Sequence, residues 1–353
     1  MRKFNKQETL AISYMKAIGI AFVVAGHYTS GFFNVMQPYL FHMPLFFFIG
    51  GITTKEEPIN FEWIKRLSKK LIPYIVITYL ITGLFSVILN KSTGFYYGTP
   101  FGNGILSTLK LIYIKNFHNN SLFLVCWFLV AYYFSSILTR LSVTLSNTSK
   151  FPREVLLLIG VPLGWFGCNL LPALHSSSHN QIFNILSQVS YGSMFMIVGF
   201  LLKNLTFKLR NPVVAVILLM LIGTGVSLGY FKQSAMAWSN YPAGFMGTSI
   251  GAFLCIAIVV AVSNILSSNN YSLLKYIGDQ SKTIMSYHLS AFASINVFAL
   301  YIFDFKNIDG VKLNNAYNHY SFIIYTIVGI SVPLIGLKIK EWVLLSHTKV
   351  RRP

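Results

Sequence analysis

Two ionisable residues, Lys16 and His27, interrupt the first long apolar segment of the chain, residues 11–31. An ionisable side chain inside a membrane helix is costly to desolvate, faces the protein interior or a wet cavity, and is a functional candidate by default. Histidine titrates near neutral pH, so it can act as a base toward a weak nucleophile such as a hydroxyl group. We therefore place the candidate site on this segment.

The spacing of the two residues indicates a shared direction. Lys16 and His27 are eleven positions apart, and at about 3.6 residues per turn eleven steps return a helix to nearly the same face, about 16 Å further along its axis. The pattern predicts that both side chains point toward the same interior surface of the protein.

The composition indicates a membrane protein. The chain has 353 residues, of which 54% are hydrophobic and 10% charged, and its mean hydropathy is +0.59. These values are not those of a soluble protein. The net charge of +19 would suggest nucleic acid in a soluble protein, but here we assign it to basic loops facing anionic membrane lipid. With the charge assigned to lipid, we expect no nucleic-acid partner. The three cysteines show no metal-ligand spacing, so we expect neither a metal site nor a disulfide framework.

Apolar runs long enough to cross a bilayer recur along the whole chain. Since a span needs roughly 17–25 mostly apolar residues, we predict ten membrane helices at about 11–33, 39–53, 71–89, 122–141, 154–171, 186–202, 212–231, 243–263, 281–303 and 320–338. The second run is short for a span and could be tilted or partly re-entrant. The prediction is an all-α polytopic bundle in one integral-membrane domain, residues 1–353.

Charge alternation predicts the orientation of these helices. Twenty-one of the 28 Lys and Arg residues fall in the tails and alternate loops of one side, six fall in the opposite loops, and Lys16 lies within the membrane. Because cytoplasmic loops carry the excess of Lys and Arg, both termini are expected to be cytoplasmic.

Two motifs give the chain a family resemblance. Lys16, ten intervening residues and His27 resemble the Arg/Lys-ten-His signature of the membrane-bound acyltransferase-three family, which O-acetylates sugars and related acceptors and includes fucose-4-O-acetylase-like proteins. The run FHMPLFFFIGG, residues 41–51, resembles the family's Met-Pro-Leu-Phe-Phe-Phe run. His42 in this run could face His27 across a pocket, or it could be an interfacial histidine bonded to a loop carbonyl.

A basic cluster follows at the expected start of the third helix. In KRLSKKLIPY, residues 65–74, Arg66 and Lys69 resemble the family's Arg-x-x-Arg pair, with Lys in the second place. The resemblance implies that they bind the phosphates of coenzyme A, since a basic helix N-terminus is a plausible anion seat. Positive-inside anchoring explains the same cluster equally well.

Two later stretches add weaker candidates. Trp127 lies in a run that resembles a Trp-Phe-Leu run of the family's central helices, although such an aromatic residue is more often packing. IGDQSKTIMSYHL, residues 277–289, resembles the family's late Gly-x-x-Ser stretch and carries Tyr287 and His288 as candidate pocket residues. Asp279 is interpreted as a helix N-cap. The chain lacks the acid that members carry shortly before the basic residue of the first helix, so Lys16 needs another partner or meets an anion directly.

The resemblance implies an acyltransferase of a bacterial inner membrane that moves an acetyl group from cytoplasmic acetyl-CoA to a hydroxyl of a surface glycan or its lipid-linked precursor. His27 would be the base or would first carry the acetyl group, and Lys16 would steady the donor. The alternative is a transporter or flippase with Lys16 and His27 on the substrate path, although no internal repeat is visible. A catalytically dead relative that serves as a membrane partner is a third reading. The sequence leaves a homo-oligomer open.

Overall fold

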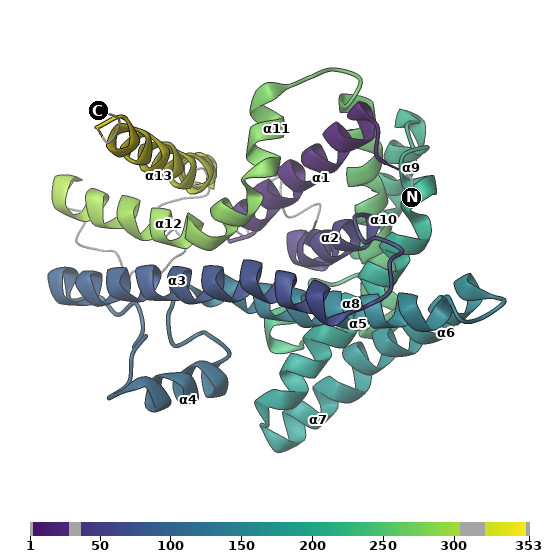
Figure 1. Cartoon of the computed structure of the whole chain (residues 1–353), viewed down its shortest axis with the longest axis horizontal. Helices are drawn as coiled ribbons and strands as arrows, with labels where there is room; N and C mark the ends of the chain where they lie inside the picture. Colours follow the sequence, from purple (N-terminus) through teal and green to yellow (C-terminus); the bar gives the residue numbers. More distant parts are fainter. Residues whose placement is uncertain (1–2, 28–36, 304–321, 351–353) are drawn as a thin grey trace.

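The computed structural model describes residues 3–27, 37–303 and 322–350. Within these ranges the chain forms an all-α bundle (Figure 1). Eight helical segments there are long and apolar enough to cross a membrane: α1 (Lys6–Ala25), α3 (Phe61–Thr93), η2 with α5 (Leu124–Cys126, Trp127–Ser146), α6 with η3 and α7 (Pro152–Trp165, Phe166–Leu170, Leu171–Ser178), α8 (Gln181–Thr206), α10 (Gly244–Leu266), α12 (Ser281–Phe303) and α13 (Phe322–Val350). With the shorter apolar helices α2 (Pro38–Ile52) and α9 (Pro212–Ser227), they account for all ten predicted segments.

Asparagine residues begin several of these helices. Asn5 accepts a hydrogen bond from the backbone N–H of Glu8, whose carboxylate accepts one from the Asn5 N–H. The side chains of Asn60, Asn180 and Asn211 each accept one hydrogen bond from a backbone N–H in the first turn of α3, α8 and α9. A short polar side chain satisfies amide groups that the first turn of a helix leaves unpaired. The helix starts are therefore encoded locally.

Helices α1 and α2 lie at the centre of the bundle. Helix α2 packs against α1, α5, α8 and α10, and nearly all its residues are buried. Gly51 and Gly199 allow its close approach to α8: a Cβ atom on Gly51 would lie 1.9 Å from the carbonyl oxygen of Met196, and one on Gly199 would lie 2.2 Å from that of Phe48. Close packing across small residues is typical of membrane helices. Because protein surrounds it, α2 can be shorter than a full span.

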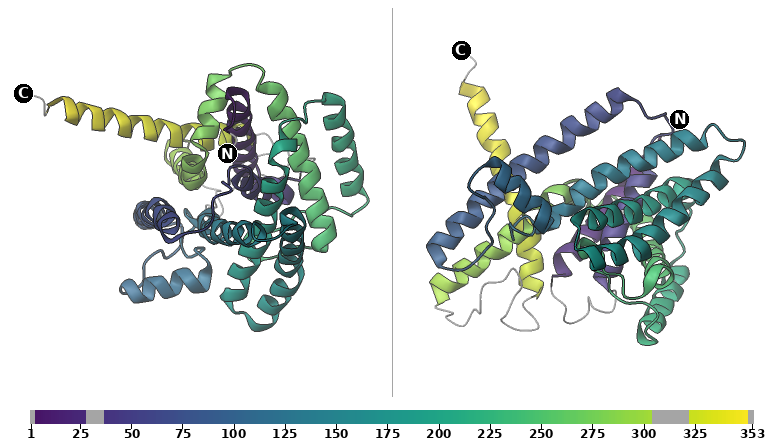
Figure 2. Two further views of the ribbon diagram at one scale, coloured as in Figure 1. Left: turned by 45° about the vertical axis from the view of Figure 1, so that its right-hand side comes forward. Right: turned by 90° about the horizontal axis from the view of Figure 1, so that it is seen from below.

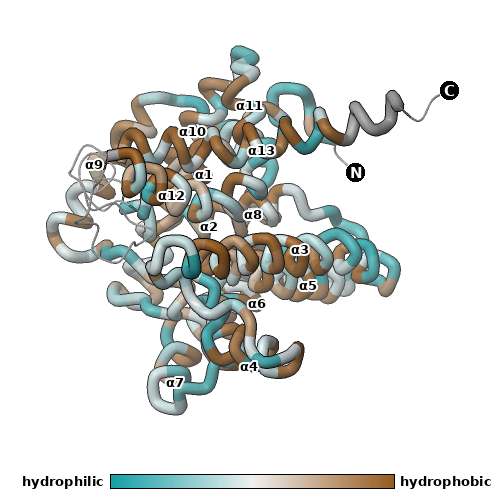
Figure 3. Tube along the Cα trace, turned by 90° about the vertical axis from the view of Figure 1, so that its left-hand side faces the viewer, coloured by the Kyte–Doolittle hydropathy of each residue, from teal (hydrophilic) through white to brown (hydrophobic). Residues whose placement is uncertain are grey.

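The outer helices present apolar side chains away from the bundle. Ile77, Ile81, Leu84 and Ile88 of α3 are each about half exposed or more, and Figure 3 shows hydrophobic residues running along α3 and α13. Both views of Figure 2 show the C-terminal part of α13 projecting from the other helices. Exposed apolar surface of this extent suits contact with lipid.

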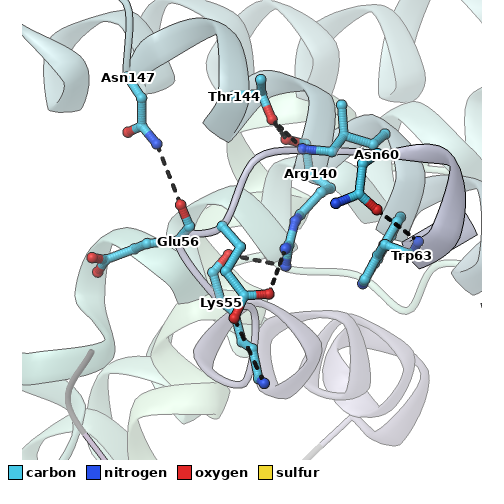
Figure 4. A network of polar contacts seen from close by, with 9 residues as sticks. Lys55, Glu56, Asn60, Trp63, Arg140, Thr144 and Asn147 are labelled. Atoms are coloured by element: carbon cyan, nitrogen blue, oxygen red, sulfur yellow. Dashed lines mark hydrogen bonds and ion pairs between the residues drawn. The ribbon is translucent and has the colours of Figure 1, made fainter.

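A polar clamp holds the loop between α2 and α3 against α5 (Figure 4). Arg140 of α5 is buried, donates to the carbonyl oxygen of Lys55 at 3.1 Å and to the carboxylate of Glu57 at 3.2 Å, and stacks on Trp63 at 5.1 Å from the ring centroid. Arg140 is therefore a structural residue, although the charge pattern alone counts it as a loop cation. Thr53, just before this loop, lines a cavity described below.

The boundaries of several helices differ from the prediction by a few residues, and two of the differences reach ten residues or more. Helix α3 begins at Phe61 rather than 71, and α13 continues to Val350 rather than 338. A polar stretch of helix precedes the apolar run in α3 and follows it in α13. The length of an apolar run predicts only the part of a helix that lies in lipid. Residues 28–33, the end of the predicted first span, lie outside the described residues.

Candidate functional site

Helix α1 ends at Ala25, before His27, so Lys16 and His27 do not share one helix face as predicted. His27 lies in a cavity of about 170 Å³, which we call the histidine cavity. Its wall is aromatic and apolar with three histidines, and is made of Val23, His27, Tyr39, His42, Met43, His118, Leu124, Val125, Trp127, Ser234, Ala235, Met236, Ala237, Trp238 and Met285. A mostly apolar pocket with a few convergent polar groups is the usual form of a small-molecule site.

His27 contacts His288 of α12. Their Nε2 atoms are 3.1 Å apart, and the ring centroids are 5.1 Å apart. Phe292, one turn further along α12, presents its ring to both imidazoles, at 5.9 Å from His27 and 5.5 Å from His288. His288 is fully buried. The structure therefore brings together two candidates that lie 261 residues apart in the sequence.

Backbone carbonyls determine which nitrogen of His288 carries the proton. Its Nδ1 lies 3.1 Å from the carbonyl oxygen of Ile284 and 2.9 Å from that of Met285. A carbonyl oxygen only accepts, so Nδ1 is protonated and, in the neutral ring, Nε2 is an acceptor. His27 must then donate through its own Nε2. The neutral His27 ring consequently keeps Nδ1 as an unprotonated nitrogen that can take up a proton.

His42 shares the histidine cavity with His27 and is buried. Its Nδ1 donates to the carbonyl oxygen of Pro38, one turn earlier in α2, and its ring meets Tyr39 edge-on at 5.0 Å. Both readings of this residue thus hold in part: it lies on the same cavity as His27, and it bonds a main-chain carbonyl, although that carbonyl belongs to its own helix.

His118 and Trp238 form the rim of the histidine cavity. Their rings are 3.9 Å apart between centroids. His118 donates from Nδ1 to the carbonyls of Lys115 and Asn116. Burial lowers the pKa of His118, against the opposing effect of these two bonds, so the ring is neutral at pH 7 and its Nε2 is an acceptor. Neither rim residue stood out in the sequence.

Buried amides fix the turn that carries Trp238. This turn is η4 (Met236–Trp238), and the Ala237 carbonyl accepts hydrogen bonds from Asn116 at 3.1 Å, Asn184 at 3.2 Å and Gln188 at 2.8 Å. Ser239, the next residue, has a φ of +51°, a left-handed conformation that is uncommon for a non-glycine residue. The rim is a preorganised part of the fold.

A second cavity of about 320 Å³ lies toward the other end of α1 and α2, and we call it the lysine cavity. Its wall combines three lysines and one acid with aromatic and small residues: Lys16, Phe46, Ile49, Gly50, Thr53, Lys70, Leu71, Phe128, Leu129, Tyr132, Asp279, Ser281, Lys282 and Met285. Three cations around one carboxylate favour an anionic ligand.

Asp279 supplies the acid that the first helix lacks. It is the last residue of α11 (Ser272–Asp279), and its carboxylate accepts from the Ser13 hydroxyl at 2.7 Å and pairs with Lys275 at 2.5 Å. Burial alone would raise the pKa of Asp279, but these bonds and the charges of Lys275 and Lys16 hold it below its ordinary value. The carboxylate is therefore ionised and close enough to Lys16 to interact with it.

Gly278 makes this arrangement sterically possible. A Cβ atom on Gly278 would lie 1.8 Å from the carbonyl oxygen of Ser13. The backbone of α11 therefore touches α1 one turn before Lys16, which places Asp279 beside it. The N-cap interpretation of Asp279 is wrong, because this residue ends α11 and bonds to α1 instead.

Of the other predicted site residues, Trp127 lines a cavity and Arg66 and Lys69 do not. Trp127 is buried and lines the histidine cavity. Arg66 and Lys69 are exposed on α3 and line neither cavity, whereas their neighbour Lys70 lines the lysine cavity. Because α3 begins at Phe61, the free amides of its first turn lie well before Arg66, so the helix N-terminus argument does not apply to this cluster.

Tyr287 faces a different part of the molecule from His288. It lines a separate groove formed with residues of α3 and α13, including Tyr74, Pro333 and Lys340. The structure thus separates Tyr287 from His27. In the described part of the chain, no group of three or more His, Cys, Asp or Glu side chains is arranged to hold a metal ion.

The apolar helices define a multi-pass membrane protein, and they enclose one cavity lined by histidines and another lined by lysines. An acyltransferase domain family matches residues 9–337, nearly the whole chain. The chain therefore belongs to this acyltransferase family and is a membrane acyltransferase, which confirms the resemblance given by the Lys16 and His27 motif. Searches of curated proteins and of solved structures give no match.

Proposed function

We propose that the protein transfers an acetyl group from cytoplasmic acetyl-CoA to a hydroxyl of a cell-surface glycan, or of its lipid-linked precursor, in a bacterial inner membrane. The observation that carries the proposal is the placement of Lys16 on α1, and of His27 just after α1 ends, in two cavities that share the wall residue Met285. One cavity suits the anionic donor, and the other offers a base to the acceptor.

The donor would enter the lysine cavity. Lys16, Lys70 and Lys282 line it, and charge alternation expects this end of the bundle to be cytoplasmic. Arg66 lies four residues before Lys70, on the same face of α3. It could therefore hold phosphates of coenzyme A that remain outside the cavity while the thioester end is inside.

The acceptor hydroxyl would enter the histidine cavity and meet His27. As His27 Nδ1 takes the hydroxyl proton, the oxygen attacks the thioester carbonyl, a carbon–oxygen bond forms and the carbon–sulfur bond breaks. The proton then passes to the departing thiolate, so that the products are the ester and coenzyme A. In a two-step route, His27 first takes the acetyl group as the carbon–sulfur bond breaks and then passes it to the hydroxyl oxygen. The hydroxyl proton ends on the thiolate, so the products are again the ester and coenzyme A.

Family membership favours this activity over the transporter or flippase that the sequence alone left open. The rim residues His118 and Trp238 support a ring-shaped polar acceptor, because a neutral imidazole nitrogen and an exposed indole face suit the hydroxyls and the apolar face of a sugar.

The test is glycan acetylation with His27 variants. His27→Ala should lower acetylation of the surface polysaccharide by about 10²–10⁴-fold, the usual contribution of a general base, at unchanged membrane abundance. His27→Gln should be equally inactive, because an amide does not take up a proton near pH 7. Mass spectrometry of the polysaccharide and immunoblots of the membrane fraction measure both quantities.

A matched control is His179→Asn, which removes an exposed histidine at the end of α7 where the backbone is left-handed and suits Asn. It should acetylate like the wild type. Substantial acetylation by either His27 variant at normal abundance would remove His27 from the mechanism, and an unaltered polysaccharide in cells without the gene would refute the proposed reaction.

A further inference from the structure

Met285 separates the two cavities. Among the described residues it alone lines both of them, and its side chain is only 3% exposed. On α12 it lies three residues after Lys282, which lines the lysine cavity, and three residues before His288, which bonds to His27. Positions three apart lie on neighbouring parts of one helix face. This face of α12 therefore leads from the lysines to the histidine pair.

The rest of the partition is built from packed aromatic residues. On α5, Trp127 lines the histidine cavity and Phe128, the next residue, lines the lysine cavity. The Phe128 ring packs against Phe46, Phe47 and Tyr132, with centroid distances of 6.0, 4.9 and 5.6 Å. Rings held on several sides have little room to turn, since protein interiors are close-packed.

Met285 differs from these neighbours in flexibility. A methionine side chain is unbranched, has three rotatable bonds and adapts to irregular space. Its main chain is nevertheless fixed, because the Met285 carbonyl accepts the Nδ1 proton of His288 at 2.9 Å. Met43 and Met236 line the histidine cavity alone, so Met285 is the methionine that borders both cavities, and it lies directly beside the histidine that orients His27.

We propose that Met285 is the acyl gate of this enzyme: its side chain closes the wall between the two cavities and limits the group that reaches His27 to a short acyl chain such as acetyl. This inference rests on the proposed function, since a donor thioester in the lysine cavity must pass this wall to reach an acceptor beside His27. Each added methylene of the acyl chain needs space that the methionine side chain occupies.

The first experiment measures acyl selectivity with the purified full-length protein reconstituted in lipid vesicles. Met285→Ala should raise the ratio of propionyl to acetyl transfer by roughly tenfold or more, within the 10–200-fold range that one methylene produces in a pocket. Met285→Phe should lower acetyl transfer while coenzyme A still binds, as measured by calorimetry. Met194→Ala is the control, because Met194 is equally buried but lines neither cavity.

The second experiment tests the wall without any catalysis. In a full-length chain whose Cys126, Cys168 and Cys255 are replaced by alanine, His27→Cys provides a thiol in the histidine cavity. A small charged thiol reagent applied from the lysine-cavity face should label it slowly when Met285 is present and several-fold faster with Met285→Ala. The added Met194→Ala substitution should leave the labelling rate unchanged.

The two measurements separate the failure of the gate from the failure of the reaction. If wild-type protein transfers no acetyl group but Met285→Ala opens the labelling path, the reaction is wrong and the barrier role stands. If acetyl is transferred and neither the acyl ratio nor the labelling rate responds to Met285→Ala in folded protein, the gate is overturned.

Discussion

At the scale of single residues, main-chain carbonyls determine which ring nitrogen carries the proton in three of the four histidines of the site. His42, His118 and His288 all present Nδ1 to backbone carbonyl oxygens. Each is therefore a donor at Nδ1 and, when neutral, an acceptor at Nε2. His27 is different because its partner is another imidazole, so its Nε2 donates and its Nδ1 is left to accept a proton.

This proton arrangement predicts the effect of changing His288. His288→Ala removes the acceptor for His27 Nε2–H, so we expect kcat to fall about 10–100-fold because the base is no longer held in one orientation and tautomer. The KM for acetyl-CoA should not change, because the proposed donor site is the lysine cavity. Steady-state kinetics on membranes of equal protein content measure both parameters.

The conservative variant His288→Gln separates orientation from packing. Its amide oxygen restores an acceptor, so kcat should partly recover. Equal losses in kcat, abundance and thermal stability for both variants would instead assign His288 to packing alone.

The lysines predict how the donor binds. Lys70→Ala should raise the KM for acetyl-CoA several-fold because Lys70 lines the lysine cavity, and Arg66→Ala should raise it less because Arg66 lies outside. Both effects should shrink as ionic strength rises, since salt screens exposed charges. Lys150→Ala, which removes an exposed cation between α5 and α6, serves as the control. A KM that responds equally to all three variants would show a general surface-charge effect.

At the scale of elements, the contact of α11 with α1 positions the charges around Lys16. Gly278 touches the Ser13 carbonyl, and Asp279 bonds to the Ser13 hydroxyl. One short helix thereby delivers an acid to the first membrane helix from a position 266 residues away. The same helix leads into α12, which carries Lys282, Met285 and His288.

Substitution of Gly278 tests this contact. Gly278→Ala places a Cβ atom against backbone, which cannot move aside as a flexible side chain can, so we expect a loss of about 2–3 kcal/mol in stability and reduced transfer activity. Thermal unfolding of the solubilised protein checks the first effect. Gly336→Ala is the matched control, because a Cβ atom there meets nothing within 4 Å. Normal stability of Gly278→Ala would show that α11 does not bear on α1 as described.

At the scale of the whole molecule, the ten apolar helices and the charge bias predict one topology. Reporter fusions after Arg210 and after Pro353 should both report the cytoplasm, and a fusion after Asn120 should report the opposite side. A non-cytoplasmic result at Pro353 alone would indicate an odd number of crossings. The short α2, enclosed by other helices, would then be the first segment to re-examine.

The same topology gives the two cavities their expected sides. On the lysine cavity, Lys16 lies midway along α1 and Thr53 lies just after α2. On the histidine cavity, His27 follows the end of α1 and Tyr39 lies at the start of α2. Under the proposed function, donor and acceptor would enter from opposite ends of the bundle and react where the two cavities share Met285. A single chain would in this way connect a cytoplasmic donor to an acceptor across the membrane.

The sequence by itself determined the class of the protein, its ten apolar helical segments and the candidate residues Lys16, His27, His42, Trp127 and His288. Apolar run length and the spacing between Lys16 and His27 are local properties, and length and periodicity are what a bilayer and a helix impose on a chain. Asparagine caps are local in the same sense. The prediction erred at α3 and α13 because apolar content marks the part of a helix in lipid, whereas the helix itself ends where its backbone is capped.

Only the tertiary structure decided which residues meet. Asp279 beside Ser13, and His288 on His27, are contacts between positions 266 and 261 residues apart. In the charge pattern Lys70 and Lys282 are only two of the many cytoplasmic cations, and nothing in the sequence distinguishes Met285; helix packing places all three on the cavities. Which faces of two helices pack together depends on close contacts at residues such as Gly278 and Gly51. Such a contact requires the shapes of both helices, and a local sequence pattern describes only one of them.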